Sequence, residues 1–146
     1  PDRSVFILEH QDGDIRYELE HGGYAIEDSA LYLSVRTRPI DPDVFPETYS
    51  FAVEGYPLVH GMLPQVIELS SNALDGPPNV HVYTTFHALA VQATLGIVVQ
   101  DDPQMVVTLH VVSDDVDYYG EKAKPNAFKG STDLREMAKS DLWIPL

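Results

Sequence analysis

The chain has 146 residues, and 23 Asp and Glu against 9 Lys and Arg give it a formal net charge of -14. Nucleic-acid phosphates and anionic lipid repel a polyanion of this kind, which excludes nucleic acid and membrane surfaces as partners. The absence of cysteine excludes disulfides, thiolate metal sites and cysteine nucleophiles. Without cysteine, and without an apolar run of the about 18 residues that a membrane span needs, we expect a cytoplasmic protein.

Composition indicates a folded chain. Hydrophobic residues make up 44% and charged residues 22% of the sequence, an ordinary balance for a globular protein. The length suits one core, and no repeat or linker divides it. We therefore expect residues 1–146 to form a single β-rich globular domain.

The first strand signals surround an Asp-Gly pair. Residues 4–10 and 15–20 have strand character, and Asp12-Gly13 between them is the strongest short hairpin signal in the sequence. The pair Gly22-Gly23 then predicts a second turn, which leads into a short strand.

Two later segments alternate with a period of two, as half-buried strands do. Residues 31–38 predict a strand with one apolar face and one face in water, and residues 49–54 repeat the pattern. The apolar sets are Leu31, Leu33 and Val35 in the first segment and Tyr49, Phe51 and Val53 in the second.

The stretch 80–113 is expected to hold the centre of the sheet. Its two most apolar segments, 97–100 and 105–112, predict a hairpin in which Val99 pairs with Met105. A slip by one residue would place His110 on the apolar face. The preferred register aligns the apolar pairs Ile97/Val107, Leu95/Leu109 and Ala93/Val111.

Two segments carry helical signals. Residues 84–95 fit either a helical stripe or a strand with a bulge, and the neighbouring Val, Tyr and Thr favour the strand. Near the end, Ser131 is a candidate cap for a short helix that extends to Lys139. Together these patterns predict an all-β, mainly antiparallel fold: a β-sandwich or barrel of about 8 strands with a short C-terminal helix.

Histidine and tyrosine supply the candidate ligand-binding residues. His81, Tyr83 and His87 share the polar face of a strand over 80–88, and His110 lies on the polar face of a neighbouring strand. Two histidines six positions apart on one strand are about 20 Å apart, too far to hold one ion. A metal site would need His87, His110 and a carboxylate from elsewhere, and the alternative is that all four side chains are half-exposed surface groups.

Acidic residues at 114–117 supply a candidate calcium site. Asp114, Asp115 and Asp117 offer the oxygen ligands that Ca²⁺ prefers. The stretch resembles the opening of an EF-hand loop, but Tyr119 and Asn126 depart from that pattern at its fifth and twelfth places, so an EF-hand is rejected. No cofactor is predicted, and calcium shared between acidic loops is the open alternative.

No catalytic motif accompanies these residues: the sequence contains no nucleophile elbow, phosphate loop, zinc-protease helix or dinucleotide fingerprint. We therefore expect a non-enzymatic, acidic protein-interaction domain that binds or inhibits a basic protein partner, in the manner of an immunity protein. The alternatives are a calcium- or carbohydrate-binding β-sandwich module and a small β-barrel enzyme that uses His and Asp or Glu. A homo-oligomer stays open, and the dispersal of acids over many turns favours a solvated surface over one recognition patch.

Overall fold

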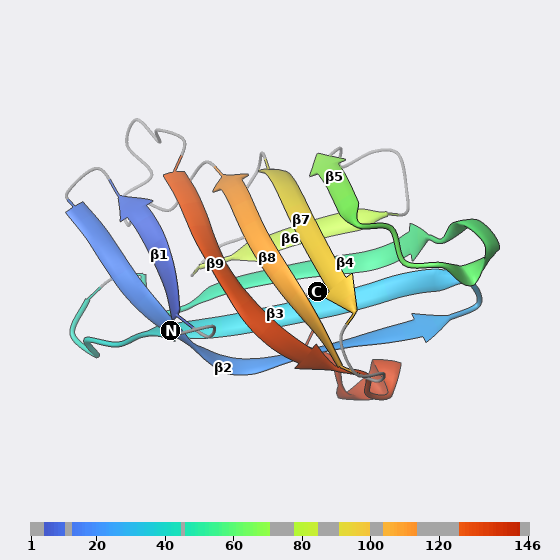
Figure 1. The fold of residues 1–146 in the computed structure, drawn as a ribbon. Coiled ribbons are helices and arrows are strands. Elements are labelled where there is room, and N and C mark those ends of the chain that lie inside the picture. Colours follow the sequence, from blue (N-terminus) through green and yellow to red (C-terminus); the bar gives the residue numbers. More distant parts are fainter. Residues whose placement is uncertain are drawn as a thin grey trace.

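The polypeptide forms one strongly bent antiparallel sheet that curls into a nearly closed, barrel-like wall (Figure 1). The computed structural model describes residues 5–10, 13–44, 46–70, 78–84, 91–99, 104–113 and 126–143. Nine strands lie in these ranges, in the spatial order β5-β7-β8-β9-β1-β2-β3-β4-β6. The strands are β1 (Val5–His10), β2 (Gly13–Glu27), β3 (Ala30–Pro39), β4 (Tyr49–Pro57), β5 (Val66–Ser70), β6 (Asn79–Tyr83), β7 (Val91–Val99), β8 (Gln104–Ser113) and β9 (Asn126–Arg135).

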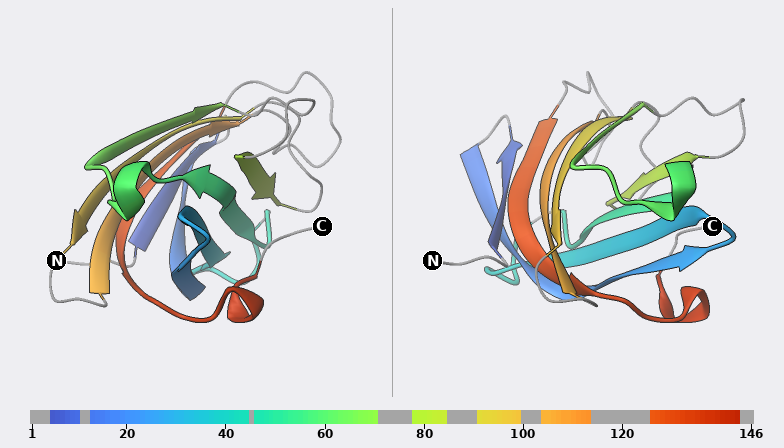
Figure 2. Two further views of the ribbon diagram at one scale, coloured as in Figure 1. Left: turned by 90° about the vertical axis from the view of Figure 1, so that its right-hand side faces the viewer. Right: turned by 45° about the vertical axis from the view of Figure 1, so that its right-hand side comes forward.

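The predicted all-β, mainly antiparallel fold class is confirmed. Of the two predicted forms, sandwich and barrel, the sheet has the barrel-like one. The pairing of β1 with β9 joins the two ends of the chain, so the sheet bends round and β9, β8 and β7 lie across from β3 and β4 (Figures 1 and 2). The edge strands of this described sheet are β5 and β6.

The first hairpin is confirmed, whereas the predicted turn at Gly22-Gly23 is wrong. His10 pairs with Gly13, and β2 then runs without a break to Glu27, with a bulge after Leu19. The two glycines serve close packing instead, because a Cβ on Gly22 would lie 2.8 Å from Leu134 Cδ2.

The β2–β3 hairpin turns at Asp28 and Ser29. Both residues have positive φ, 53° and 60°. This is the backbone that a two-residue turn needs to match the right-handed twist of its strands.

The predicted register of the central hairpin is confirmed. Val99 pairs with Met105, and the other three apolar pairs also align. Ala93, Leu95 and Ile97 are buried and His110 is exposed, so the register keeps His110 off the apolar face, as predicted. Residues 91–95 are strand rather than helix, and residues 85–90, where the bulge was predicted, lie outside the described ranges.

Helical structure in the described ranges is limited to two three-residue 3-10 turns, η1 (Val59–Gly61) and η2 (Lys139–Asp141), and no helix there is long and apolar enough to cross a membrane. The short C-terminal helix is therefore present as η2, but its predicted start at Ser131 is wrong. Residues 131–135 complete β9 because they pair with β8, and Thr108 and Ser131 are joined by a hydroxyl hydrogen bond of 2.8 Å.

Aromatic rings around Phe128 fill the interior. Phe128 stacks on Tyr49 at 3.9 Å and on Phe6 at 5.2 Å between ring centroids, and Tyr17 meets it edge-on at 5.8 Å. The hydroxyl groups of Tyr17 and Tyr49 both form hydrogen bonds inside the barrel-like sheet. Tyr17 donates to the carbonyl of Pro46 at 2.7 Å, and the Tyr49 and Ser113 hydroxyls are 3.0 Å apart.

We expect these two tyrosines to make stability fall in strong base. Burial raises the pKa of both Tyr17 and Tyr49 well above the ordinary value of 10.0, and the neighbouring Tyr49 raises that of Tyr17 further. Above about pH 10 the unfolded chain releases these protons while the folded chain keeps them, so the free energy of unfolding should fall by up to about 1.4 kcal/mol per pH unit for each tyrosine.

Urea unfolding from pH 9 to 12 measures this slope. The double variant Tyr17→Phe, Tyr49→Phe should be less stable at neutral pH but show a flatter alkaline decline. An equally steep decline in the double variant would contradict the assignment.

Candidate functional site

Two of the predicted ligand-binding residues, His81 and Tyr83, lie on the outer face of β6, on either side of the inward-facing Val82. The His81 imidazole Nε2 is 3.5 Å from Glu54 Oε1, and it is buried without a hydrogen bond to a described residue. Asn79 donates to the same Glu54 oxygen at 3.2 Å. His81 therefore faces a neighbouring strand rather than an open ligand site.

His110 lies elsewhere, on the outer face of β8. Its cross-strand neighbours are Thr94 on β7 and Lys129 on β9, and Glu68 on β5 pairs with Thr94. His110, Thr94 and Glu68 border a depression of about 430 Å³. The sheet order separates β8 from β6, so the described histidines do not converge, and His87 lies outside the described residues.

The calcium candidate stays a prediction. Asp114, Asp115 and Asp117 lie outside the described ranges. Within those ranges, no group of three or more His, Asp or Glu side chains is placed to hold a metal ion.

A segment that begins within the predicted C-terminal helix covers part of the wall from outside. Residues 136–143, which we call the C-terminal strap, cross the outer face of β2 and β3. The Met137 backbone N–H donates to the Tyr24 carbonyl at 2.8 Å, and the Met137 side chain lies directly over Gly23. Lys139 Nζ sits 4.2 Å from the centre of the Tyr32 ring.

Trp143 extends the strap towards β6. Its ring lies 4.9 Å from the Arg36 guanidinium and 6.0 Å from the Tyr83 ring. The predicted wet face of β3 is present at Tyr32, Arg36 and Arg38, which are partly or fully exposed. Ser34 is the exception: it points outward, yet it is fully buried, as is the outward-facing Ala52 beside it, and the strap explains this cover. Tyr83 thus contacts the strap.

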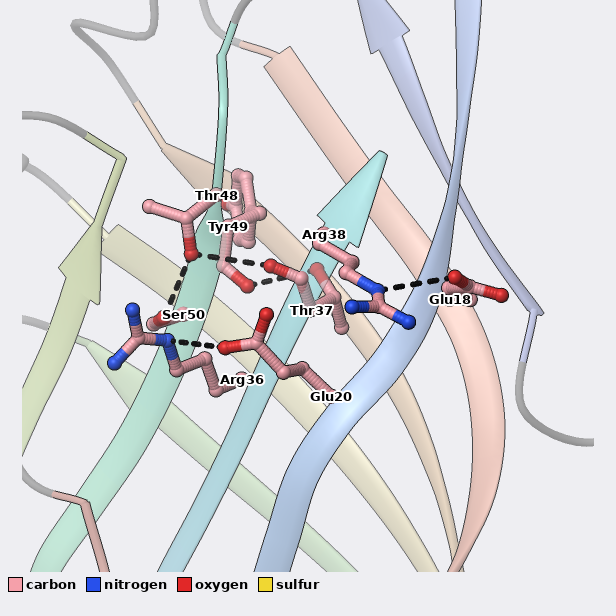
Figure 3. Close-up of polar contacts among 8 residues, drawn as sticks. All are labelled: Glu18, Glu20, Arg36, Thr37, Arg38, Thr48, Tyr49 and Ser50. Carbon is pink, nitrogen blue, oxygen red and sulfur yellow. Dashed lines mark hydrogen bonds and ion pairs between the residues drawn. The ribbon is translucent and has the colours of Figure 1, made fainter. Parts of the chain in front are cut away.

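Ion pairs line the neighbouring outer wall (Figure 3). The Arg38 and Arg36 guanidinium groups each lie 3.0 Å from a carboxylate on β2, that of Glu18 and that of Glu20 respectively. Lys129 on β9 pairs with Glu9 on β1. Three of the described cations are therefore neutralised along strands, each by an acid on the adjacent strand.

Acids without such partners gather where β2 begins and β3 ends. The Ile40 N–H donates to the Arg16 carbonyl at 2.9 Å, which holds these two segments together. Asp41 accepts a 3.0 Å hydrogen bond from the backbone of Asp43, and within the described residues neither Asp14 nor Asp41 forms an ion pair. A cleft of about 300 Å³, which we call the acidic cleft, is lined by Asp14, Ile15, Arg16, Ile40, Asp41 and Val44.

The sequence interpretation treated the acids of this cleft as dispersed turn residues. Asp14 and Asp41 are far apart along the chain, and only the pairing of β2 with β3, in which Tyr17 meets Pro39, brings them together. The acidic cleft could therefore have been predicted only from the pairing of β2 with β3.

Comparisons with known proteins give no match: no family model, no curated protein and no solved structure is similar to the chain. The fold and surfaces therefore define an acidic, all-β protein with a barrel-like sheet. Its function has to be inferred from the surfaces themselves.

We expect Gly23→Ala to loosen the C-terminal strap without unfolding the sheet. A Cβ at position 23 would lie 2.6 Å from Met137 Sδ, and this flexible side chain can move, whereas the sheet backbone cannot. Amide exchange of Met137 should accelerate about tenfold, since its hydrogen bond to Tyr24 would open more often.

Trp143 fluorescence gives a second reading of strap displacement. In the Gly23→Ala variant, the additional substitution Met137→Ala should make room for the new methyl group. Exchange of the residue 137 amide should then be slow again. Exchange unchanged by Gly23→Ala would show that Met137 does not hold the strap.

Proposed function

We propose that the protein is a non-enzymatic interaction domain that binds a basic protein partner through the acidic cleft. The observation that carries the proposal is the contrast between charged side chains that form ion pairs and those that do not. Arg36, Arg38 and Lys129 form ion pairs with acids on adjacent strands, while Asp14 and Asp41 form none within the described residues and lie next to aliphatic side chains.

The lining suits a lysine or arginine side chain. Ile40 is 48% exposed, and with Val44 it offers an apolar surface for the aliphatic part of such a side chain. The charged end then meets Asp14 and Asp41. Arg16, in the same cleft, disfavours a second cation there, so the cleft suits one basic side chain of a basic segment at a time.

The whole-chain charge supports the same partner class. A net charge of -14 accelerates the approach of a basic protein and slows that of an acidic one. Long-range attraction supplies the encounter rate, and contacts at the cleft supply affinity. These two contributions predict different responses to substitution.

The test compares two charge-matched double variants. Asp14→Asn with Asp41→Asn removes two charges from the cleft and keeps the Asp41 side-chain oxygen that accepts from Asp43. Glu27→Gln with Asp28→Asn removes two charges at the β2–β3 turn, and Asn tolerates the positive φ of 53° at position 28.

A hexalysine peptide is a suitable probe, with binding followed by calorimetry and by amide shifts. We expect the cleft variant to weaken binding about fivefold and the control variant less than about twofold, since only the cleft charges lie in contact. Equal weakening of peptide binding in both variants would mean that the peptide is attracted by the net charge of the chain and makes no specific contact with the acidic cleft. Binding that is insensitive to salt would contradict the proposal outright.

A further inference from the structure

Among the described residues, nothing requires position 96, in the middle of β7, to be glycine. Its φ is not positive, and the β7–β8 ladder runs past it without a bulge. A Cβ placed there would meet only Thr108 Cβ, at 3.8 Å, an ordinary contact. Above Gly96 the described residues leave a hollow of about 590 Å³, which Pro64, Gln65 and Val98 also border.

The other strand glycines have internal reasons. Gly22 and Gly23 lie under Leu134 and Met137, and a Cβ on Gly130 would be 2.8 Å from the Val5 carbonyl as well as against Phe6. Gly55 has a φ of 78° where the β3–β4 register shifts. Glycine within a regular strand is unfavourable unless another backbone or a ligand approaches closely, and at Gly96 the described residues supply no such neighbour.

Exposed valines surround Gly96. Val66 on β5 pairs with Gly96, and Val98 on β7 pairs with Val106 one step along the same outer face. Val66 and Val98 are each 59% exposed, and Val106 is half-buried. We call the outer surface formed by Val66, Gly96, Val98, Val106 and Thr108 the valine face.

The valine face is also nearly uncharged. The three strands β5, β7 and β8 contain one acidic residue, Glu68, and no lysine or arginine, in a chain whose net charge is -14. A basic or acidic partner would find almost no opposite charge on this wall. A second copy of the chain would find the same apolar surface and would be repelled least in this orientation.

We propose that the valine face is a homodimer interface, in which two copies pack the outer faces of β5, β7 and β8 against each other about a two-fold axis. In such a contact each patch meets itself, and sheets pack face to face at about 10 Å. Gly96 lets the two sheets approach where they cross. The valines of both copies leave water, which supplies the driving force. This inference concerns a surface separate from the acidic cleft and does not depend on the proposed function.

Sedimentation velocity over a concentration series tests the proposal. The mass of the wild-type chain should rise from 16.3 kDa towards twice that value between about 10 and 500 µM, the range for a small apolar interface. Added salt should leave the dimer intact or strengthen it, because salt screens the repulsion between two acidic chains. This response is opposite in sign to that of hexalysine binding.

Gly96→Ala separates assembly from folding. The variant should unfold at the same or a higher temperature at low concentration, since the methyl group meets no atom within 3.8 Å and glycine disfavours strands. Its dimer dissociation constant should rise about tenfold, because the methyl group enters the space between the two copies.

Val98→Lys and Ile7→Lys form a matched pair of controls. Both place a lysine at an exposed aliphatic position on the outer sheet, Val98 at 59% and Ile7 at 39% exposure, but Ile7 lies on β1, away from the valine face. Only Val98→Lys should abolish the dimer. A monomer throughout the wild-type series, or a dimer that survives both Gly96→Ala and Val98→Lys, would overturn the proposal.

Discussion

The architecture depends on one aromatic contact, the stacking of Phe128 between Phe6 and Tyr49 inside the barrel-like sheet. These rings come from β9, β1 and β4, so the contact joins the first strand, the last strand and the opposite wall. A flat sheet would leave them in water, and burial of rings of this size is a large favourable contribution to folding. Curling the sheet is what allows the rings to meet.

Closure of the sheet sets what the outer surface can do. With the aromatic rings inside, every second side chain of each strand points outward, and different sectors meet different environments. The C-terminal strap covers the outer face of β3 at Ser34, which is fully buried. Ion pairs occupy the next sector, the acidic cleft lies where β2 begins, and the valine face lies beyond β9. Charge is therefore segregated, although the sequence spreads acids over many turns.

The two proposals draw on opposite properties of this surface. The acidic cleft would use the excess charge to bind a basic partner, and the valine face would use its near-absence of charge to bind a second copy. The β9 and β1 strands separate the two regions in the sheet order. Engagement of one region leaves the other open, so the two activities are compatible in one molecule.

Local periodicity in the sequence determined the all-β class, the first hairpin and the central register, because alternating apolar residues permit only one face and one slip to be buried. Tertiary structure decided the rest. Residues 131–135 begin the predicted helix but join β9, since strand pairing with β8 outweighs a short helix. Gly22-Gly23 has the sequence of a turn but makes room for Leu134 and Met137. The cleft needed the β2–β3 pairing to unite Asp14 with Asp41. Periodicity reports which residues face inward, whereas a site depends on which outward residues become neighbours, and only the closed sheet determines that.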